Sequence, residues 1–414
     1  LDVADAAFTD SIGWSVAVSG NRVVVGAPYR PGTALNSGEA FLYRLGGANP
    51  TEPIATLNVP SPSGLDAFGT SVSISGNILV VGAPGKADAA TIGGRAYAFD
   101  FVAEYPSEPI VTFNKPNGNP SHRFGAATAI EGHHVVIGWN GGMSAYDLAS
   151  ETPETPLLTV QFGGGFGKAL AISGTRIVVG APGGIAGADG SGSALVFDLA
   201  SSDPQTPVAI FNNPAPAPAD GFGAAVAISG SRVLIGTPDD DAALTNAGIV
   251  YLYDLAGLPS TAPVLTIAPP TTKRFARFGA ALALFGDIAA IAAPTENVAG
   301  YIAGNVYVYD LAGLTPAIPS FALHRPGLEI PRQFGTNLSI FGTRLCVGAP
   351  HDDTGAVRAG IAYLYELEGT SPANPAVVLV NPTPDYDDRF GSAVAVSDDR
   401  IAFGVALDDA VMGD

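Results

Sequence analysis

Short apolar runs bounded by turn residues follow one another along the whole chain, and they are of two kinds. One kind alternates apolar and small positions, as in Ala225–Ser229, whereas the other is continuous, as in Val23-Val24-Val25. Alternation indicates a strand with one buried face, and a continuous short run is typical of a strand buried on both faces. No segment shows the periodicity of an amphipathic helix. The pattern therefore predicts an all-β protein.

These runs belong to a repeat that covers the chain. A Phe-Gly pair, or the variant Ile12-Gly13, recurs with its glycine at positions 13, 69, 125, 167, 223, 279, 335 and 391. The spacing is 56 residues throughout, except for 42 residues between Gly125 and Gly167. Thirteen residues after each glycine comes a Gly-Ala-Pro triplet or a variant of it, as at Gly26 and Gly82. The units start near residues 12, 68, 124, 166, 222, 278, 334 and 390.

Each unit contains four apolar runs, which we name strands a, b, c and d. A tight turn such as Ser19-Gly20-Asn21-Arg22 joins a to b, and longer loops join b to c and d to the next a. Four short antiparallel strands repeated around a closed ring form a β-propeller. We expect one propeller domain over residues 1–414.

The number of blades follows from counting strands. The sequence has eight a–b pairs but only seven c–d pairs, because the last unit ends at Asp414. We favour eight blade positions with the eighth incomplete, and a seven-bladed ring with a displaced terminal hairpin is the alternative. An open edge at an incomplete blade invites a strand from elsewhere. Three sources of such a strand are open: a neighbouring copy, which would give self-association, the N-terminal segment Leu1 to Phe8, or residues beyond 414 in a longer gene product.

Composition narrows the classes of partner. Nineteen basic and 38 acidic residues give a net charge of −19, which disfavours nucleic acid and anionic membrane surfaces. No run of 18 apolar residues is present, so we expect no membrane insertion. The single cysteine, Cys346, lies in a strand-b run and is expected to be buried.

The Phe-Gly and Gly-Ala-Pro markers resemble the FG-GAP repeat of integrin α-chain heads and many secreted bacterial proteins. The resemblance implies a propeller with strand a innermost, and an extracellular or cell-surface location. Many blades of that family carry an Asp-x-Asp-x-Asp-Gly calcium loop between strands a and b. Here the a–b link is only a tight turn, so we expect no calcium site of that type.

The b–c and d–a loops share one face of the disc, which we call the long-loop face. Acidic residues gather there, and those we select as binding candidates are Asp239, Asp240, Asp352, Asp353, Asp387 and Asp388. They predict either a site for a cation or a basic partner, or a solvated acidic rim.

The third unit is the short one, and its Gly-Ala-Pro position reads Gly138-Trp139-Asn140. Its loops are shortened, so we expect a notch in the long-loop face there. Trp139, beside Asn140, could stack on a sugar or an aliphatic side chain, or it could fill the space that the lost loops leave.

Catalytic signatures are absent from the sequence. There is no Gly-x-Ser-x-Gly elbow and no spaced histidine pair, and His133-His134 occupy an a–b turn on the face opposite His351. We therefore expect no enzyme, no metal and no cofactor. The favoured function is a secreted or cell-surface adhesion propeller that recognises a protein or a glycan through the long-loop face. A structural subunit of an extracellular polymer or filament is the alternative, and a propeller enzyme is the third hypothesis.

Overall fold

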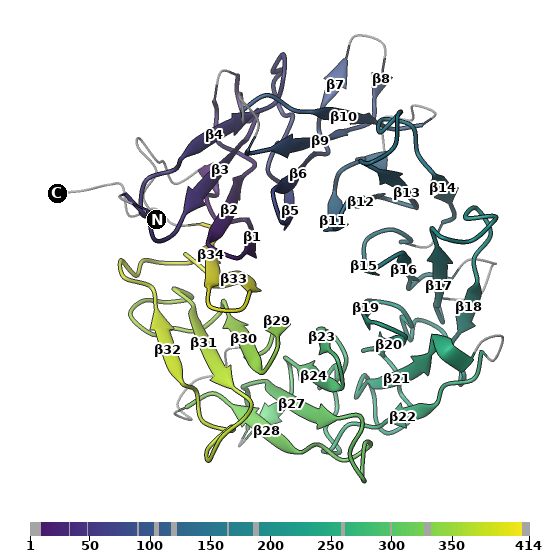
Figure 1. The fold of residues 1–414 in the computed structure, drawn as a ribbon. Helices are drawn as coiled ribbons and strands as arrows, with labels where there is room; N and C mark the ends of the chain where they lie inside the picture. Colours follow the sequence, from purple (N-terminus) through teal and green to yellow (C-terminus); the bar gives the residue numbers. More distant parts are fainter. Residues whose placement is uncertain are drawn as a thin grey trace.

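The strands of the protein form a ring of radial sheets in a computed structural model (Figure 1). The structure describes residues 10–32, 34–47, 49–88, 91–102, 107–116, 122–163, 165–184, 190–257, 261–298, 300–326 and 333–407. Within the described residues, seven sheets have four antiparallel strands each, and three sheets have two strands. In each four-stranded sheet the strand that comes first in the chain lies nearest the centre of the ring (Figure 1). The expected all-β propeller is confirmed.

The first four blades follow the chain in order. Blade 1 contains β1 (Ser15–Ser19), β2 (Arg22–Ala27), β3 (Glu39–Arg44) and β4 (Ala55–Asn58). Blade 2 contains β5 (Ser71–Ser75), β6 (Ile78–Ala83), β9 (Arg95–Asp100) and β10 (Val111–Asn114), with β7 (Ala87–Asp88) and β8 (Thr91–Ile92) in its b–c loop. Blade 3 contains β11 (Ala127–Glu131), β12 (His134–Trp139), β13 (Gly142–Asp147) and β14 (Leu158–Gln161). Blade 4 contains β15 (Leu170–Ser173), β16 (Arg176–Ala181), β17 (Ser193–Asp198) and β18 (Ala209–Asn212).

Three further blades and a hairpin complete the ring. Blade 5 contains β19 (Ala225–Ser229), β20 (Arg232–Thr237), β21 (Ile249–Asp254) and β22 (Leu265–Ile267), with a 3₁₀ turn, η3 (Leu255–Gly257), after β21. Blade 6 contains β23 (Leu282–Phe285), β24 (Ile288–Ala293), β27 (Asn305–Asp310) and β28 (Phe321–His324), with β25 (Asn297–Val298) and β26 (Tyr301–Ile302) in its b–c loop. Blade 7 contains β29 (Asn337–Phe341), β30 (Arg344–Ala349), β31 (Ile361–Glu366) and β32 (Val377–Val380). The hairpin is β33 (Phe390–Val396) and β34 (Ile401–Val405).

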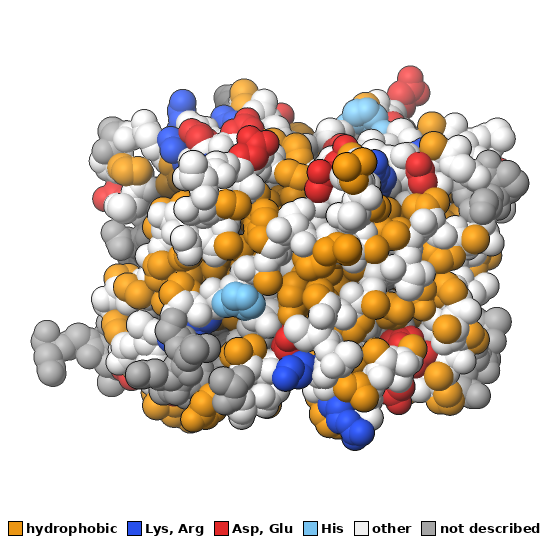
Figure 2. Space-filling view, turned by 90° about the horizontal axis from the view of Figure 1, so that it is seen from below, with side chains coloured by type: hydrophobic (Ala, Val, Ile, Leu, Met, Phe, Trp, Pro, Cys, Tyr) orange, Lys and Arg blue, Asp and Glu red, His pale blue; other side chains and the backbone are white. Residues whose placement is uncertain are grey.

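The core lies between neighbouring blades. Strand b is buried on both faces in the seven four-stranded blades, as its continuous apolar run predicts, whereas only alternate residues of β34 are buried. Cys346 on β30 is fully buried. The phenylalanine of each Phe-Gly pair that the sequence analysis identified is buried, and Phe222 packs edge-on to Tyr253 of the same unit. Outside the core, hydrophobic side chains gather across the middle of the rim, and most charged ones lie near the two faces (Figure 2).

The glycine that recurs in each repeat has a steric cause at the contact between blades. A Cβ placed on Gly26 of β2 would lie 2.1 Å from the carbonyl oxygen of Gly69 in the next unit. No side chain fits at that distance, so the strands approach closely only where glycine stands.

The same contact closes the ring through the hairpin. A Cβ on Gly404 of β34 would lie 1.9 Å from the carbonyl oxygen of Gly13 in the first unit. The hairpin also packs against β29 and β30 on its other side. It therefore lies in an eighth position between blade 7 and blade 1, which Figure 1 also shows. Seven complete four-stranded blades with an incomplete eighth position are compatible with the favoured expectation.

Blade 3 keeps all four strands with a minimal b–c connection. Only Asn140 and Gly141 separate β12 from β13, whereas residues 28–38 separate β2 from β3. The shortened spacing of the third unit thus falls on its loops. No helix among the described residues has both the length and the apolar character needed to cross a membrane.

Candidate functional site

The long-loop face is built from pairs of loops that hydrogen-bond to each other. The backbone N–H of Phe275, in the loop after β22, donates to the carbonyl of Thr245, in the loop after β20, at 2.8 Å. Arg277 N–H donates to Asn246 at 3.0 Å. The same bonds recur in blade 7, where Asp387 N–H donates to the carbonyl of the b–c loop. The face is therefore a preformed scaffold.

These hydrogen-bonded loops carry large surface side chains on residues whose backbone conformation is unusual. Phe275 and Arg277 have φ angles of 59° and 55°, in the left-handed region. Residues other than glycine adopt it only where the surrounding structure holds them. Phe275 is 57% exposed, so the strained backbone presents an aromatic ring to solvent.

A groove between blades 5 and 6 opens beside this ring. Its cavity measures about 560 Å³. Residues from both b–c loops and the connecting d–a loop line it, namely Asp239, Asn246, Arg274, Phe275, Arg277, Thr295, Asn297 and Ile302. Ile302 of β26 is 48% exposed and adds a second apolar side chain. A volume of this size admits several side chains of a polypeptide or a small oligosaccharide.

The charges in the groove are unevenly neutralised. Asp239 pairs with Arg277, whose Nε lies 3.0 Å from Asp239 Oδ1, and accepts from Asn246 Nδ2 at 3.2 Å. Arg274 is exposed, and no ion pair to it is found within the described part of the chain. The groove therefore combines apolar surface with a guanidinium that a carboxylate of a partner could engage.

A buried pair of carboxylates lies under the neighbouring loops of blade 5. Asp220 and Asp240 are each 2% exposed. Asp220 Oδ2 accepts from Asn213 Nδ2 and from Ala217 N, both at 2.7 Å, and Asp240 Oδ1 accepts from Ala242 N at 2.8 Å. Burial raises the pKa of both acids, and the negative charge of Asp220 raises the pKa of Asp240 further.

The corresponding positions of blade 2 show what this pair replaces. Asp66 and Lys86 stand there at the same distances from their unit's glycines, and they form a buried ion pair at 3.4 Å. In blade 5 an aspartate stands where Lys86 stands. Burial next to Asp220 therefore disfavours the ionised form of Asp240, and its buried carboxylate does not reach a ligand on the rim.

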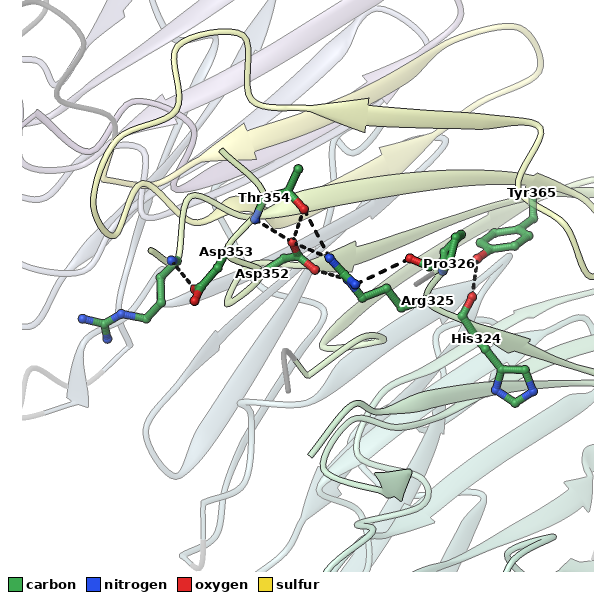
Figure 3. Close-up of polar contacts among 8 residues, drawn as sticks. His324, Arg325, Pro326, Asp352, Asp353, Thr354 and Tyr365 are labelled. Carbon is green, nitrogen blue, oxygen red and sulfur yellow. Dashed lines mark hydrogen bonds and ion pairs between the residues drawn. The ribbon is translucent and has the colours of Figure 1, made fainter. Parts of the chain in front are cut away.

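The acidic candidates of blade 7 are also held by the protein. Asp352 is fully buried and forms an ion pair with Arg325, from the loop after β28 (Figure 3). It also accepts from Thr354 N at 2.8 Å. Asp353 accepts the backbone N–H of Arg358 at 2.7 Å (Figure 3). These carboxylates order the b–c loop.

The last two acidic candidates lie in the loop before the hairpin. Asp387 pairs with Arg389 at 2.9 Å and with Arg358 at 3.2 Å. Asp388 is fully buried, and its Oδ2 accepts from Asn381 Nδ2 at 2.7 Å. Arg358 thus links the loops that carry Asp353 and Asp387, whereas Asp239 and Asp240 lie two blades away. The candidates do not converge on one site.

The hypothesis that Trp139 contacts a ligand is wrong for this structure. Its side chain is 1% exposed and packs against Phe124 with ring centroids 5.4 Å apart. Gly142 makes room for it, because a Cβ there would lie 2.3 Å from the indole ring. The ring fills the space left by the short loop, which was the other interpretation. Asn140 beside it is exposed, and its backbone N–H donates to the carbonyl of His122.

The exposed aromatic residues of this face were missed from the sequence. Trp14, directly before β1, is 40% exposed and makes an edge-on contact with Tyr29, with ring centroids 5.6 Å apart. Other units carry Thr, Ala, Lys or Ser after the same glycine, so the large ring was a signal. Phe275 stands four residues before the glycine of its Phe-Gly pair, in a loop, and Leu65 is the equivalent apolar residue of blade 2. A large apolar residue at this loop position was the signal, and Leu65 is also 63% exposed.

Comparison with known proteins agrees with this architecture. The FG-GAP repeat profile matches residues 3–43, 61–99 and 215–253. No curated protein sequence matches the chain. Among many similar solved structures is "The crystal structure of BamB from Moraxella catarrhalis", with a TM-score of 0.55 and 13% identity over 95% of this chain and 93% of that one. At that identity the likeness shows the fold.

Proposed function

This chain carries FG-GAP repeats folded as a β-propeller, and from that premise we propose that it is a non-catalytic binding propeller of the cell surface or the extracellular space. Its ligand is a protein, held on the long-loop face in the groove between blades 5 and 6. The FG-GAP resemblance and the low lysine content, four residues in all, support the location.

The observation that carries the proposal is the composition of the groove. Phe275 and Ile302 are about half exposed beside Arg274, which is exposed and has no ion pair among the residues that the structure describes. Aromatic residues and arginine are enriched at the centres of protein interfaces. Because the hydrogen-bonded loops already hold these side chains, a partner loses little free energy in ordering them. The arrangement favours a peptide segment with an apolar side chain followed by a carboxylate.

Selection of a displayed random-peptide library on the immobilised protein tests this proposal. The double variant Phe275→Ser/Ile302→Ser should lose the enriched peptides, with affinity falling at least about tenfold, as expected for interface hot spots. Arg274→Gln should weaken only those peptides that carry an acidic residue. Leu314→Ser is the matched control, because Leu314 is fully exposed in the c–d link of blade 6, away from the groove.

Two results would contradict the groove as the protein site. Enriched peptides that bind the double variant as well as the unmodified protein would place the ligand elsewhere. Saturable binding to a glycan array without any enriched peptide would favour a carbohydrate ligand instead.

A second candidate function is a subunit of an extracellular polymer, favoured by the eighth blade position. Within the described residues, β34 pairs with β33 alone, whereas every other strand b pairs on both sides. A strand c donated by a second copy would complete the pairing and give a head-to-tail contact that can propagate.

Sedimentation over a wide concentration range should then show growing assemblies. Excess peptide with the sequence of residues 360–367, a strand c, should block them, whereas a scrambled peptide should not. A monomer at all concentrations would rule this candidate out.

A further inference from the structure

A cluster of two histidines and an aspartate lies on the face opposite the long loops, at the inner turn of blade 3. His133 occupies the tight turn between β11 and β12, and His134 is the first residue of β12. Asp147, the last residue of β13, is the direct cross-strand partner of His134. The potential ligand atoms of all three residues lie within 4.8 Å of one another.

The cluster is ordered by the strands around it. His133 Nδ1 lies 2.5 Å from Asp147 Oδ1, and that same oxygen accepts the backbone N–H of Ala149 at 2.8 Å. Leu148 N–H donates to the carbonyl of His133 at 2.9 Å, which fixes the turn against the end of β13. The two imidazole rings lie side by side, with centroids 4.3 Å apart and planes tilted by 50°. Three donors are thus held on one side of a rigid hairpin.

Other blades carry a different pair at the same two positions. Arg176 lies 3.6 Å from Asp198 in blade 4, and Arg344 lies 3.0 Å from Glu366 in blade 7. There the arginine supplies a fixed positive charge to the acid. In blade 3 a histidine replaces the arginine and a second histidine precedes it, so the acid lies beside two imidazole rings.

From this geometry we infer that His133, His134 and Asp147 bind a divalent transition-metal cation of the zinc class. Imidazole nitrogen and carboxylate oxygen are ligands for Zn²⁺, Cu²⁺ and Ni²⁺, whereas Ca²⁺ and Mg²⁺ prefer oxygen alone. Tetrahedral zinc bonds of about 2.0–2.2 Å place the ligand atoms about 3.4 Å apart. The three ligand atoms already lie within 4.8 Å of one another, and the 2.5 Å contact of His133 with Asp147 has to open for the ion to enter. His133 is more than half exposed, so the fourth coordination position is open to water or to a side chain of a partner.

The spacing of the histidines along the chain does not predict this site. Two histidines share one face of a strand or a helix at His-x-His or His-x-x-x-His spacing, whereas adjacent histidines in a strand point to opposite faces. His133 lies in the turn rather than in the strand, so its ring can lie beside that of His134. The third ligand comes from another strand, which the spacing of histidines does not reveal.

Titration of the metal-free full chain with ZnCl₂, followed by calorimetry, tests the inference. One Zn²⁺ should bind per chain, and the thermal midpoint should rise with zinc, because a ligand that binds only the folded state stabilises it. CaCl₂ should give neither effect. Co²⁺ in place of zinc should give the visible absorption of a site with nitrogen and oxygen ligands.

The double variant His133→Asn/His134→Arg is the sharpest comparison, because it installs the turn of blade 1, Asn21-Arg22. It should fold and keep its thermal midpoint without zinc, while zinc affinity falls by at least about tenfold, the loss typical of a damaged metal site. Asp147→Asn should weaken zinc as well, and its amide oxygen can still accept from Ala149. His351→Gln, on the opposite face, should bind zinc as the unmodified protein does.

The inference is overturned if the unmodified protein shows no saturable zinc binding. It is also overturned if the double variant binds zinc with unchanged affinity. In either case the contact of His133 with Asp147 serves only as the counterpart of the arginine–acid pairs in the other blades.

Discussion

Single residues in this propeller are tuned by which blade they occupy. The same loop position holds Lys86 opposite Asp66 in blade 2 and Asp240 opposite Asp220 in blade 5. The first arrangement compensates a buried charge and the second adds to it. Equivalent positions of the repeat therefore hold a paired buried charge in one blade and two buried acids in another.

Asp240→Asn should stabilise the protein at neutral pH. Burial, with Asp220 and Asp241 nearby, raises the pKa of Asp240 in the folded state. Ionisation thus costs stability above the folded-state pKa, and the cost disappears below the unfolded-state value of about 3.9. Asparagine carries no charge and can still accept from Ala242. The gain in unfolding free energy, measured with urea at several pH values, should shrink as pH falls.

Asp398→Asn is the control for this measurement, because Asp398 is exposed in the turn between β33 and β34. It should change stability little at any pH. A loss of stability for Asp240→Asn at pH 7 would mean that the carboxylate has a compensating cation in solution.

The phenylalanines of the repeat divide sharply into buried and exposed ones. Phe222→Ala should destabilise by about 3–5 kcal/mol, because Phe222 is fully buried between blades and its loss leaves a cavity. Phe275→Ala, at a ring that is 57% exposed, should stay within about 0.5 kcal/mol of the unmodified protein. Equal effects in chemical denaturation would contradict the assignment of Phe222 to the core.

At the scale of elements, loops rather than strands distinguish the blades. The b and c strands pair in the same register in each blade, whereas the b–c connection ranges from two residues in blade 3 to a loop with its own β25–β26 hairpin in blade 6. The rigid strands are shared, and the variable loops supply the groove.

Gly38 and Gly20 both have a positive φ angle, but only Gly38 is packed against another loop. Gly38 has φ of 78°, and a Cβ there would lie 2.1 Å from the carbonyl oxygen of Phe68, whereas Gly20 has φ of 54° with open space around it. Gly38→Ala should destabilise by about 3 kcal/mol or more, because backbone must move. Gly20→Ala should cost only about 1 kcal/mol, the price of the left-handed conformation. Similar thermal midpoints for the two variants would show that the contact between the b–c loop and the d–a loop is not rigid.

At the scale of the whole molecule, the ring closes through an incomplete blade. The hairpin β33–β34 contacts blade 7 on one side and blade 1 on the other, and it brings Gly404 against Gly13. A closed ring leaves no unpacked blade face. The hairpin is thus a structural part of the ring, although it has two strands.

Gly404→Ala tests that role, with Gly236→Ala as its matched comparison. The added Cβ would meet a carbonyl oxygen at 1.9 Å in the first case and 2.1 Å in the second. Both variants should lower the unfolding free energy by a similar amount, about 3 kcal/mol or more. A much smaller loss for Gly404→Ala would mean that the hairpin is peripheral to the ring.

The repeat by itself determined the strands, their order and the positions of the close glycine contacts, because each depends on a local pattern that recurs along the chain. Gly26 and Gly404 mark blade contacts wherever they stand in the sequence, since only glycine fits there. The tertiary structure alone decided the fate of individual side chains. Trp139 is buried because its short loop leaves space that Gly142 keeps open. Asp147 meets His133 because strand pairing places Asp147 opposite His134, the next residue after His133. Burial and convergence depend on neighbours across blades and strands, and a one-dimensional pattern does not carry those distances.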